Sequence, residues 1–262
     1  MLAEQLKRLQ DENIPLLFRP LHEAEGNGGS DGSLAWFWWG KHGAVTYVKI
    51  WKYLYEKLTI EYELHNLIWE QNLYTWSIDS DVWYAGDNYV DIIAYDKYNM
   101  EHHRNDGKTN CPNLDAESTI FYTLSKYVGH KKMVAIAEND SIPSLSNLKT
   151  EHAFWLYFST WFGDYIFNEV NNDKEHLIEM FTSEYCITLD ELDIDSVILD
   201  QEENNAGKKG ETNSNENSNT NSNVNSNVDS NKDTHEDDLP KSNNSRYNLI
   251  KLYVLFLYLL YL

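Results

Sequence analysis

The first part of the chain alternates between helical patterns and short apolar runs. Leu2, Leu6 and Leu9 recur at helical spacing, and residues 46–64 and 118–128 show the same periodicity. Apolar runs that predict strands cover residues 13–23, 65–72, 90–96, 132–139 and 153–161. Helices that alternate with continuously apolar strands are typical of βα units in a parallel sheet, so the pattern predicts an α/β fold.

Most of these predicted strands end in polar side chains, which a buried core strand does not need. The polar ends are His22–Glu23, Gln71–Asn72, Asp96 and Glu138–Asn139. In a (β/α)8 TIM barrel, the reactive side chains gather at the C-terminal ends of the strands. We therefore expect Leu16–Phe18 to be barrel core and the ionisable residues after it to open into a shared cleft.

The composition changes at about residue 200, which we take as the end of one folded domain, residues 1–199. Residues 200–248 are rich in Asn and Ser and predict a disordered tail. Residues 249–262 are hydrophobic, but as a helix they would extend only roughly 21 Å against a hydrocarbon core of about 30 Å. Membrane association through this segment is the less favoured interpretation, although a lipid-anchor signal or a marginal tail anchor stays open.

Charge and composition exclude several classes of partner. The formal net charge of −21 argues against a nucleic-acid partner, which needs clustered Lys and Arg. Cys111 and Cys186 suggest neither a disulfide framework nor a zinc site, and His102–His103 lie in a polar stretch that predicts a loop. We expect no metal and no cofactor. Residues 1–13 lack the apolar stretch of a signal peptide.

Aromatic residues make up 14% of the chain, with 9 Trp and 18 Tyr. They could simply fill a core, or they could form stacking platforms for the apolar faces of sugar rings. Trp36, Trp38 and Trp39 fall within four residues beside a Gly-rich loop, which favours at least one ring in a sugar subsite. Tyr84 could donate a hydrogen bond to a carboxylate, although a Tyr in a loop is more often structural.

Glu23 and Glu138 are the strongest candidates for chemistry. Hydrolysis of a glycosidic bond usually takes two carboxyl groups, one to protonate the leaving oxygen and one to act at the anomeric carbon. Each Glu alone could equally pair with an Arg or cap an element. Arg19 could hold a carboxylate through two hydrogen bonds, or form a structural ion pair. His22 and Glu23 would face opposite sides of an ideal strand, so either a bulge re-aims one of them or His22 supports the site from behind.

Several segments together resemble glycoside hydrolase family 26, the β-mannanase family. These segments are "PLLFRPLHEAEG", "WFWWG", "WYAGDNYVDIIAYDKYN", "VAIAENDSIP" and "FSTWFGDYI", and the likeness runs from about residue 10 to about residue 195. Ala85 departs from the Trp-Tyr-Pro-Gly-Asp motif of the family. The resemblance implies a secreted, retaining, endo-acting enzyme that cleaves β-1,4-mannan on a (β/α)8 barrel.

By this resemblance, Glu23 matches the acid/base and Glu138 the nucleophile of a double displacement. His22 matches the residue before the acid/base, and Tyr84 matches a tyrosine that hydrogen-bonds the nucleophile. Trp36 matches the aromatic residue after the acid/base, and Trp161 matches the tryptophan that forms the floor of the site. Apart from the resemblance, we also expect Arg19 to belong to the substrate site. Burial and the charge of the second carboxylate should raise the pKa of Glu23.

The resemblance covers only part of the family's barrel. Strands matching about the fourth to the eighth are present, so we expect a partial (β/α)8 barrel, truncated at its N-terminus. Five strands leave open sheet edges, which raises the alternative of a catalytically inactive carbohydrate-binding fragment. A third alternative is a β-glucanase or β-xylanase of the same family, because mannose and glucose differ only at the 2-hydroxyl.

Overall fold

The computed structural model describes residues 1–98, 104 and 106–191. The predicted disordered tail, the hydrophobic segment 249–262 and the predicted loop at His102–His103 lie outside the described residues. The boundary at residue 199 therefore stays a prediction. No described helix is both long and apolar enough to cross a bilayer.

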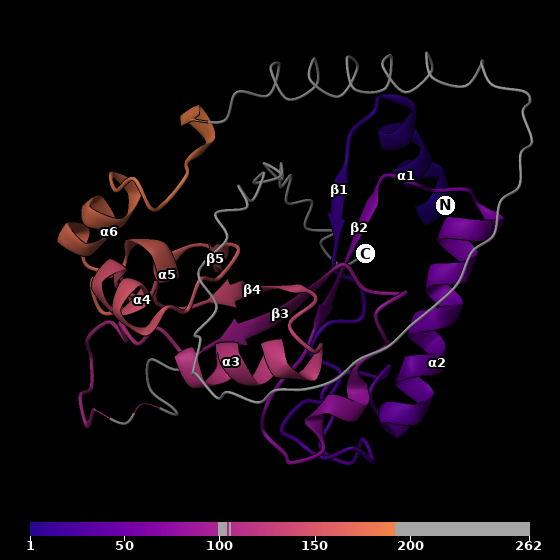
Figure 1. Ribbon diagram of the computed structural model, residues 1–262, viewed down its shortest axis with the longest axis horizontal. Helices are drawn as coiled ribbons and strands as arrows, with labels where there is room; N and C mark the ends of the chain where they lie inside the picture. The colour runs from indigo at the N-terminus through magenta and orange to yellow at the C-terminus, as the bar shows by residue number, and fades with distance from the viewer. Residues whose placement is uncertain (99–103, 105, 192–262) are drawn as a thin grey trace, which may run out of the picture. The chain divides into compact units, whose positions relative to one another are not determined.

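The described residues contain one five-stranded parallel sheet whose strands lie side by side in chain order, β1-β2-β3-β4-β5 (Figure 1). The strands are β1 (Leu16–Phe18), β2 (Leu67–Asn72), β3 (Ile92–Lys97), β4 (Met133–Asn139) and β5 (Phe158–Thr160). Sequential parallel strands joined by helical connections make up a partial (β/α)8 barrel, as the sequence predicts. β1 and β5 are the edges of this sheet within the described residues.

Helices connect or precede the strands, and the first three of them lie where helical periodicity predicts them. They are α1 (Leu2–Asp11), α2 (Gly43–Tyr55), α3 (Ser118–Tyr127), α4 (Leu145–Glu151), α5 (Asp164–Phe167) and α6 (Lys174–Phe181). A π-helical segment, η1 (Glu56–Glu61), continues α2, and η2 (Ser80–Trp83) is a 3-10 turn. The short 3-10 turn η3 (Leu189–Glu191) belongs to a separate unit that begins at Thr188.

The first predicted strand is much shorter than its apolar pattern indicates. β1 stops at Phe18, because Pro20 cannot donate to the sheet and Leu21 and Glu23 both adopt a left-handed backbone with φ of +52°. The chain therefore leaves the sheet in a turn before it reaches His22. This turn also removes the conflict over alternating faces, since His22 and Glu23 are not part of a strand.

Many aromatic residues fill the core, as one interpretation of the aromatic content predicts. Tyr47 and Trp51 of α2 are fully buried and pack with Trp69 and Trp83 near β2. Aromatic rings thus form much of the contact between helix and sheet, where each buries a large apolar area. In contrast, Trp36 keeps 46% of its surface exposed.

Candidate active site

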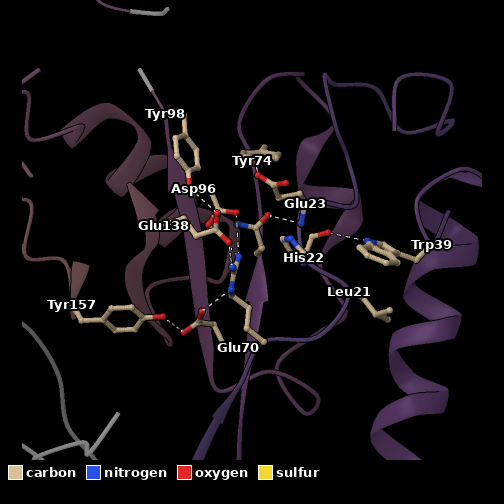
Figure 2. A network of polar contacts seen from close by, with 12 residues as sticks. Leu21, His22, Glu23, Trp39, Glu70, Tyr74, Asp96, Tyr98, Glu138 and Tyr157 are labelled. Atoms are coloured by element: carbon tan, nitrogen blue, oxygen red, sulfur yellow. Dashed lines mark hydrogen bonds and ion pairs between the residues drawn. The ribbon is translucent and has the colours of Figure 1, made fainter. Parts of the chain in front are cut away.

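A network of polar contacts brings together Glu70, Asp96 and Glu138 (Figure 2). Arg19 contacts all three of these carboxyl groups. It follows β1, and its Nη1 donates to both carboxylate oxygens of Asp96 at 3.1 and 3.2 Å. Its Nη2 donates to Glu138 Oε1, and its Nε lies 3.9 Å from Glu70 Oε1. Burial alone would lower the pKa of Arg19, but the negative charges of these carboxyl groups outweigh burial and raise it. Arg19 is therefore permanently charged.

Glu138 is held from two sides at the end of β4. The register pairs Asp96 of β3 with Glu138, so the two side chains leave adjacent strands at the same level. Arg19 forms an ion pair with one oxygen of Glu138, and the Tyr98 hydroxyl donates to Oε2 at 2.9 Å. Both contacts stabilise a negatively charged carboxylate in a fixed orientation.

Glu23 lies in the turn after β1 and is anchored through both its backbone and its side chain. Its backbone N–H donates to Asn72 Oδ1 at 2.9 Å, and its Oε1 accepts from the Tyr74 hydroxyl at 2.7 Å. Burial raises the pKa of Glu23, and the charge of Glu138 adds to this effect, although the hydrogen bond from Tyr74 opposes it. This agrees in direction with the sequence-based expectation for a carboxyl group that delivers a proton.

Glu23, Asp96 and Glu138 converge on one small region. Each offers a carboxylate oxygen, and these oxygens all lie within 4.8 Å of one another. Burial raises the pKa of Asp96 well above its usual value, while Arg19 opposes that shift. The Arg19 guanidinium group forms ion pairs with Asp96 and Glu138, so two of the three carboxyl groups belong to an ion-pair network.

His22 contacts the turn and lies close enough to Arg19 and Glu138 to feel their charges. Its backbone carbonyl accepts a hydrogen bond of 2.8 Å from Trp39 Nε1 (Figure 2). Its ring packs against Phe37 and Trp39. Burial and the nearby positive charge of Arg19 lower the pKa of His22 to about 4. The imidazole is therefore neutral at the pH of most assays.

The expected contact between Tyr84 and Glu138 is wrong. The Tyr84 hydroxyl donates to Asp87 at 3.1 Å, and Tyr98 makes the hydrogen bond to Glu138 instead. The physical reason is position: Tyr84 lies in the loop before β3, far from its C-terminal end, whereas Tyr98 directly follows that end. A usable signal was present in the sequence, because Tyr98 comes two residues after the polar strand end at Asp96.

The two predicted sugar-contacting aromatics occupy different surroundings. Trp36 packs edge-on against Tyr74 at a distance of 6.3 Å between ring centroids. Because Tyr74 also hydrogen-bonds Glu23, Trp36 contacts a direct neighbour of Glu23. Trp161 directly follows β5, and its backbone N–H donates to the carbonyl of Asn139 at 2.9 Å. Trp36 thus contacts the hydrogen-bond partner of Glu23, and Trp161 contacts the residue that follows Glu138 in the chain. Contact of either ring with a sugar stays a prediction.

Sequence reasoning missed two further groups. Tyr74 lies two residues after the polar end of β2 and contacts Glu23, so it could have been found by the same rule as Tyr98. Glu70 lies inside β2 with a fully buried side chain, and its partner Tyr157 directly precedes β5. A Glu in the middle of an apolar strand was the available signal.

Comparison with known proteins agrees with this geometry. The model of glycosyl hydrolase family 26 matches residues 1–191. A mannan endo-1,4-beta-mannosidase of Thermothelomyces thermophilus is 37% identical over 191 residues, which cover 73% of this chain and 34% of that protein. Mannan endo-1,4-beta-mannosidase B of Piromyces sp is 34% identical over 190 residues, covering 72% of this chain and 28% of that protein.

Solved structures give the same picture. A ruminal GH26 endo-beta-1,4-mannanase shares 68% identity and a TM-score of 0.72, covering 73% of this chain and 40% of that one. A beta-mannanase from a symbiotic protist of the termite Reticulitermes speratus, complexed with gluco-manno-oligosaccharide, shares 31% identity and a TM-score of 0.60, covering 72% and 52%. The chain spans about a third of the length of the two mannan endo-1,4-beta-mannosidases from Thermothelomyces thermophilus and Piromyces sp. With its family model, its relatives and its strand-end carboxyl groups in agreement, the chain belongs to glycosyl hydrolase family 26.

Proposed function

We propose that this chain carries the catalytic pair of a retaining, endo-acting β-1,4-mannanase. The observation that carries the proposal is the approach of Glu23 and Glu138, whose carboxylate oxygens lie within 4.8 Å. Retaining glycosidases keep their two carboxyl groups about 5–5.5 Å apart, whereas inverting enzymes need a wider gap of about 6.5–9.5 Å for a water molecule. The short separation therefore favours retention.

The surroundings of the two groups suit opposite roles. Glu138 receives a positive charge from Arg19 and a hydrogen bond from Tyr98, which suits an ionised nucleophile. The raised pKa of Glu23 suits a proton donor. Glu138 attacks the anomeric carbon while Glu23 protonates the departing oxygen, and a glycosyl-enzyme ester forms. Glu23 then takes a proton from water, whose oxygen attacks the anomeric carbon and releases Glu138.

The substrate assignment rests on the relatives. Those named above are mannan endo-1,4-beta-mannosidases, and one solved relative is complexed with gluco-manno-oligosaccharide. We therefore propose galactomannan or glucomannan as substrate, with β-glucan and β-xylan as the alternatives. By the same resemblance, we propose that the enzyme acts outside the cell.

A second candidate function is carbohydrate binding without turnover. The observation that favours it is the number of strands: the described residues supply five, three fewer than a closed (β/α)8 barrel. Sugar contacts contributed by further strands would be missing from these residues. The two candidates differ in turnover but not in affinity for mannan.

The deciding experiment measures the release of reducing ends from soluble galactomannan, with glucomannan, lichenan and xylan as competing substrates. The proposal expects mannan cleavage that Glu138→Ala abolishes, an early fall in viscosity, and a newly formed end in the β-configuration by proton NMR. Retained mannan binding without reducing ends supports the binding fragment. An α-configured first product refutes the retaining mechanism.

A further inference from the structure

Glu70 is a buried carboxyl group that the proposed double displacement does not use. It lies in β2, its side chain is fully buried, and the Tyr157 hydroxyl donates to its Oε2 at 2.5 Å. Figure 2 shows Glu70 and Tyr157 pointing toward each other beneath the carboxyl network. Burying an acid at this depth is costly without a compensating interaction, so its retention in a strand needs an explanation.

The second oxygen of Glu70 faces Arg19. Oε1 lies 3.9 Å from Arg19 Nε, and among the described residues it has no hydrogen-bond donor within reach. Arg19 meanwhile directs Nη1 to Asp96 and Nη2 to Glu138. A shift of less than 1 Å would turn this ion pair into a hydrogen bond from Nε, because N–H···O distances lie between about 2.7 and 3.2 Å.

We propose that Glu70, held by Tyr157, is a positioning residue that controls through Arg19 how firmly the guanidinium group holds Glu138. When Glu70 is protonated, the charge of Arg19 is directed to Asp96 and Glu138. When Glu70 is ionised, it competes for the same charge and draws Nε toward Oε1. The inference rests on the proposed function, because it concerns the residue assigned as nucleophile.

Glu70 titrates close to neutral pH. Burial raises its pKa to about 7, although the hydrogen bond from Tyr157 and the charge of Arg19 both oppose the shift. The charged or titratable groups that interact with it are Arg19 after β1, Asp96 of β3 and Tyr157 before β5. Glu138 of β4 is linked to it through Arg19. Glu70 therefore changes charge close to neutrality while Arg19 stays protonated.

Two substitutions test this idea in the pH dependence of kcat on mannan. Glu70→Gln keeps an oxygen that accepts from Tyr157 but cannot ionise, so activity should persist to higher pH than in the wild type. Tyr157→Phe removes a hydrogen bond that favours the ionised form, so it should shift the alkaline limb in the same direction. The double variant should match Glu70→Gln, and KM should stay unchanged, because the Glu70 side chain is fully buried. An unchanged alkaline limb in Glu70→Gln refutes the proposal.

A readout without activity separates this inference from the proposed function. The Nε–H resonance of Arg19, identified by its loss in Arg19→Lys, should move with an inflection near pH 7, matching the pKa of about 7 for Glu70. The inflection should disappear in Glu70→Gln and move to higher pH in Tyr157→Phe. A chain that shows this behaviour but no turnover would sink the mannanase proposal alone. A wild-type Arg19 resonance without the inflection overturns the role of Glu70.

Glu25 provides the matched control. It is a second buried carboxyl group whose pKa burial raises to about 7, but its hydrogen-bond partner is Ser80 rather than a residue of the Arg19 network. Glu25→Gln should therefore leave the Arg19 inflection where it is in the wild type. If Glu25→Gln removes the inflection as Glu70→Gln does, the signal is not specific to Glu70 and the proposal fails.

Discussion

The Tyr98 hydroxyl donates a hydrogen bond of 2.9 Å to Glu138 Oε2, across from the guanidinium group of Arg19 that binds the other oxygen. The two donors fix the plane of the carboxylate, so its lone pairs can be directed at an anomeric carbon. Fixing a nucleophile in this way removes orientational freedom that would otherwise be lost at the moment of reaction.

Tyr98→Phe should lower kcat on galactomannan roughly 10- to 100-fold, because it removes one hydrogen bond to a charged group. Tyr84→Phe is the matched comparison, since its hydroxyl contacts Asp87 and not Glu138. It should change kcat less than about twofold. If Tyr84→Phe instead lowers kcat more than Tyr98→Phe, then Tyr84 is the tyrosine that supports the nucleophile.

Glu23→Ala should lower kcat on galactomannan by about 100- to 10,000-fold, the usual contribution of a positioned general acid. An aryl β-mannoside with a good leaving group needs no proton donor in the first step, so its rate of aglycone release should fall much less. The measurement is the burst of released phenol. Equal losses on both substrates would contradict an acid/base role for Glu23.

Trp36→Ala should raise KM for mannan about 3- to 10-fold, because a half-exposed ring that stacks on a sugar contributes modest binding energy. Its edge-on contact with Tyr74 links it to Glu23, so a smaller fall in kcat is also expected. Trp38→Ala, at a more exposed position with 68% of its surface accessible, serves as the comparison. If Trp38→Ala raises KM more than Trp36→Ala does, then Trp38 rather than Trp36 stacks on the sugar.

Glu25 should make the free energy of unfolding fall as pH rises. Because burial raises its pKa from 4.5 to about 7, the unfolded chain ionises first, and stability is lost between these two pH values. Glu25→Gln cannot ionise, so its melting temperature relative to the wild type should be higher at about pH 8 than at about pH 5. A difference that does not vary with pH would show that Glu25 does not remain protonated in the folded state.

Gly26→Ala should lower the melting temperature markedly. Gly26 has a φ of +65°, and a Cβ there would lie 2.3 Å from the carbonyl oxygen of Leu34. Gly129 has a similar φ of +57°, but its nearest neighbour would lie 3.9 Å away, so Gly129→Ala isolates the cost of the backbone conformation. We expect Gly26→Ala to lower the free energy of unfolding by about 1–3 kcal/mol more than Gly129→Ala does. Equal losses would mean that the loop yields to the new methyl group.

Much of the sheet was predictable from the sequence because its strands are apolar and buried on both faces. The predicted runs at 65–72, 90–96 and 132–139 match β2, β3 and β4 within two residues at either end. Periodicity also located α3 correctly. The apolar runs at 13–23 and 153–161 overstated β1 and β5, because hydrophobicity does not register the local turns that end or delay a strand.

The site was predictable only as far as the polar strand ends. Glu23 and Glu138 were proposed as the catalytic pair, and Asp96 was noted only as a polar strand end, because all three end apolar runs and parallel strands bring such ends together. The partners of these residues were less visible: Tyr98 was passed over for Tyr84, and Glu70 was counted as part of an apolar strand. Contacts between residues 40 to 119 positions apart depend on strand register and side-chain direction, which a single sequence does not specify.

β1 ends at Phe18, so Glu23 is carried by a turn whose left-handed residues lie outside the sheet. Its aim is consequently set by neighbours such as Asn72 and Tyr74 rather than by strand hydrogen bonding. This separation makes residues 21–42, a segment that leaves out Arg19, a suitable target for directed evolution. Libraries placed there can retune proton delivery, and with it the working pH, while the scaffold that holds Glu138 keeps its own geometry.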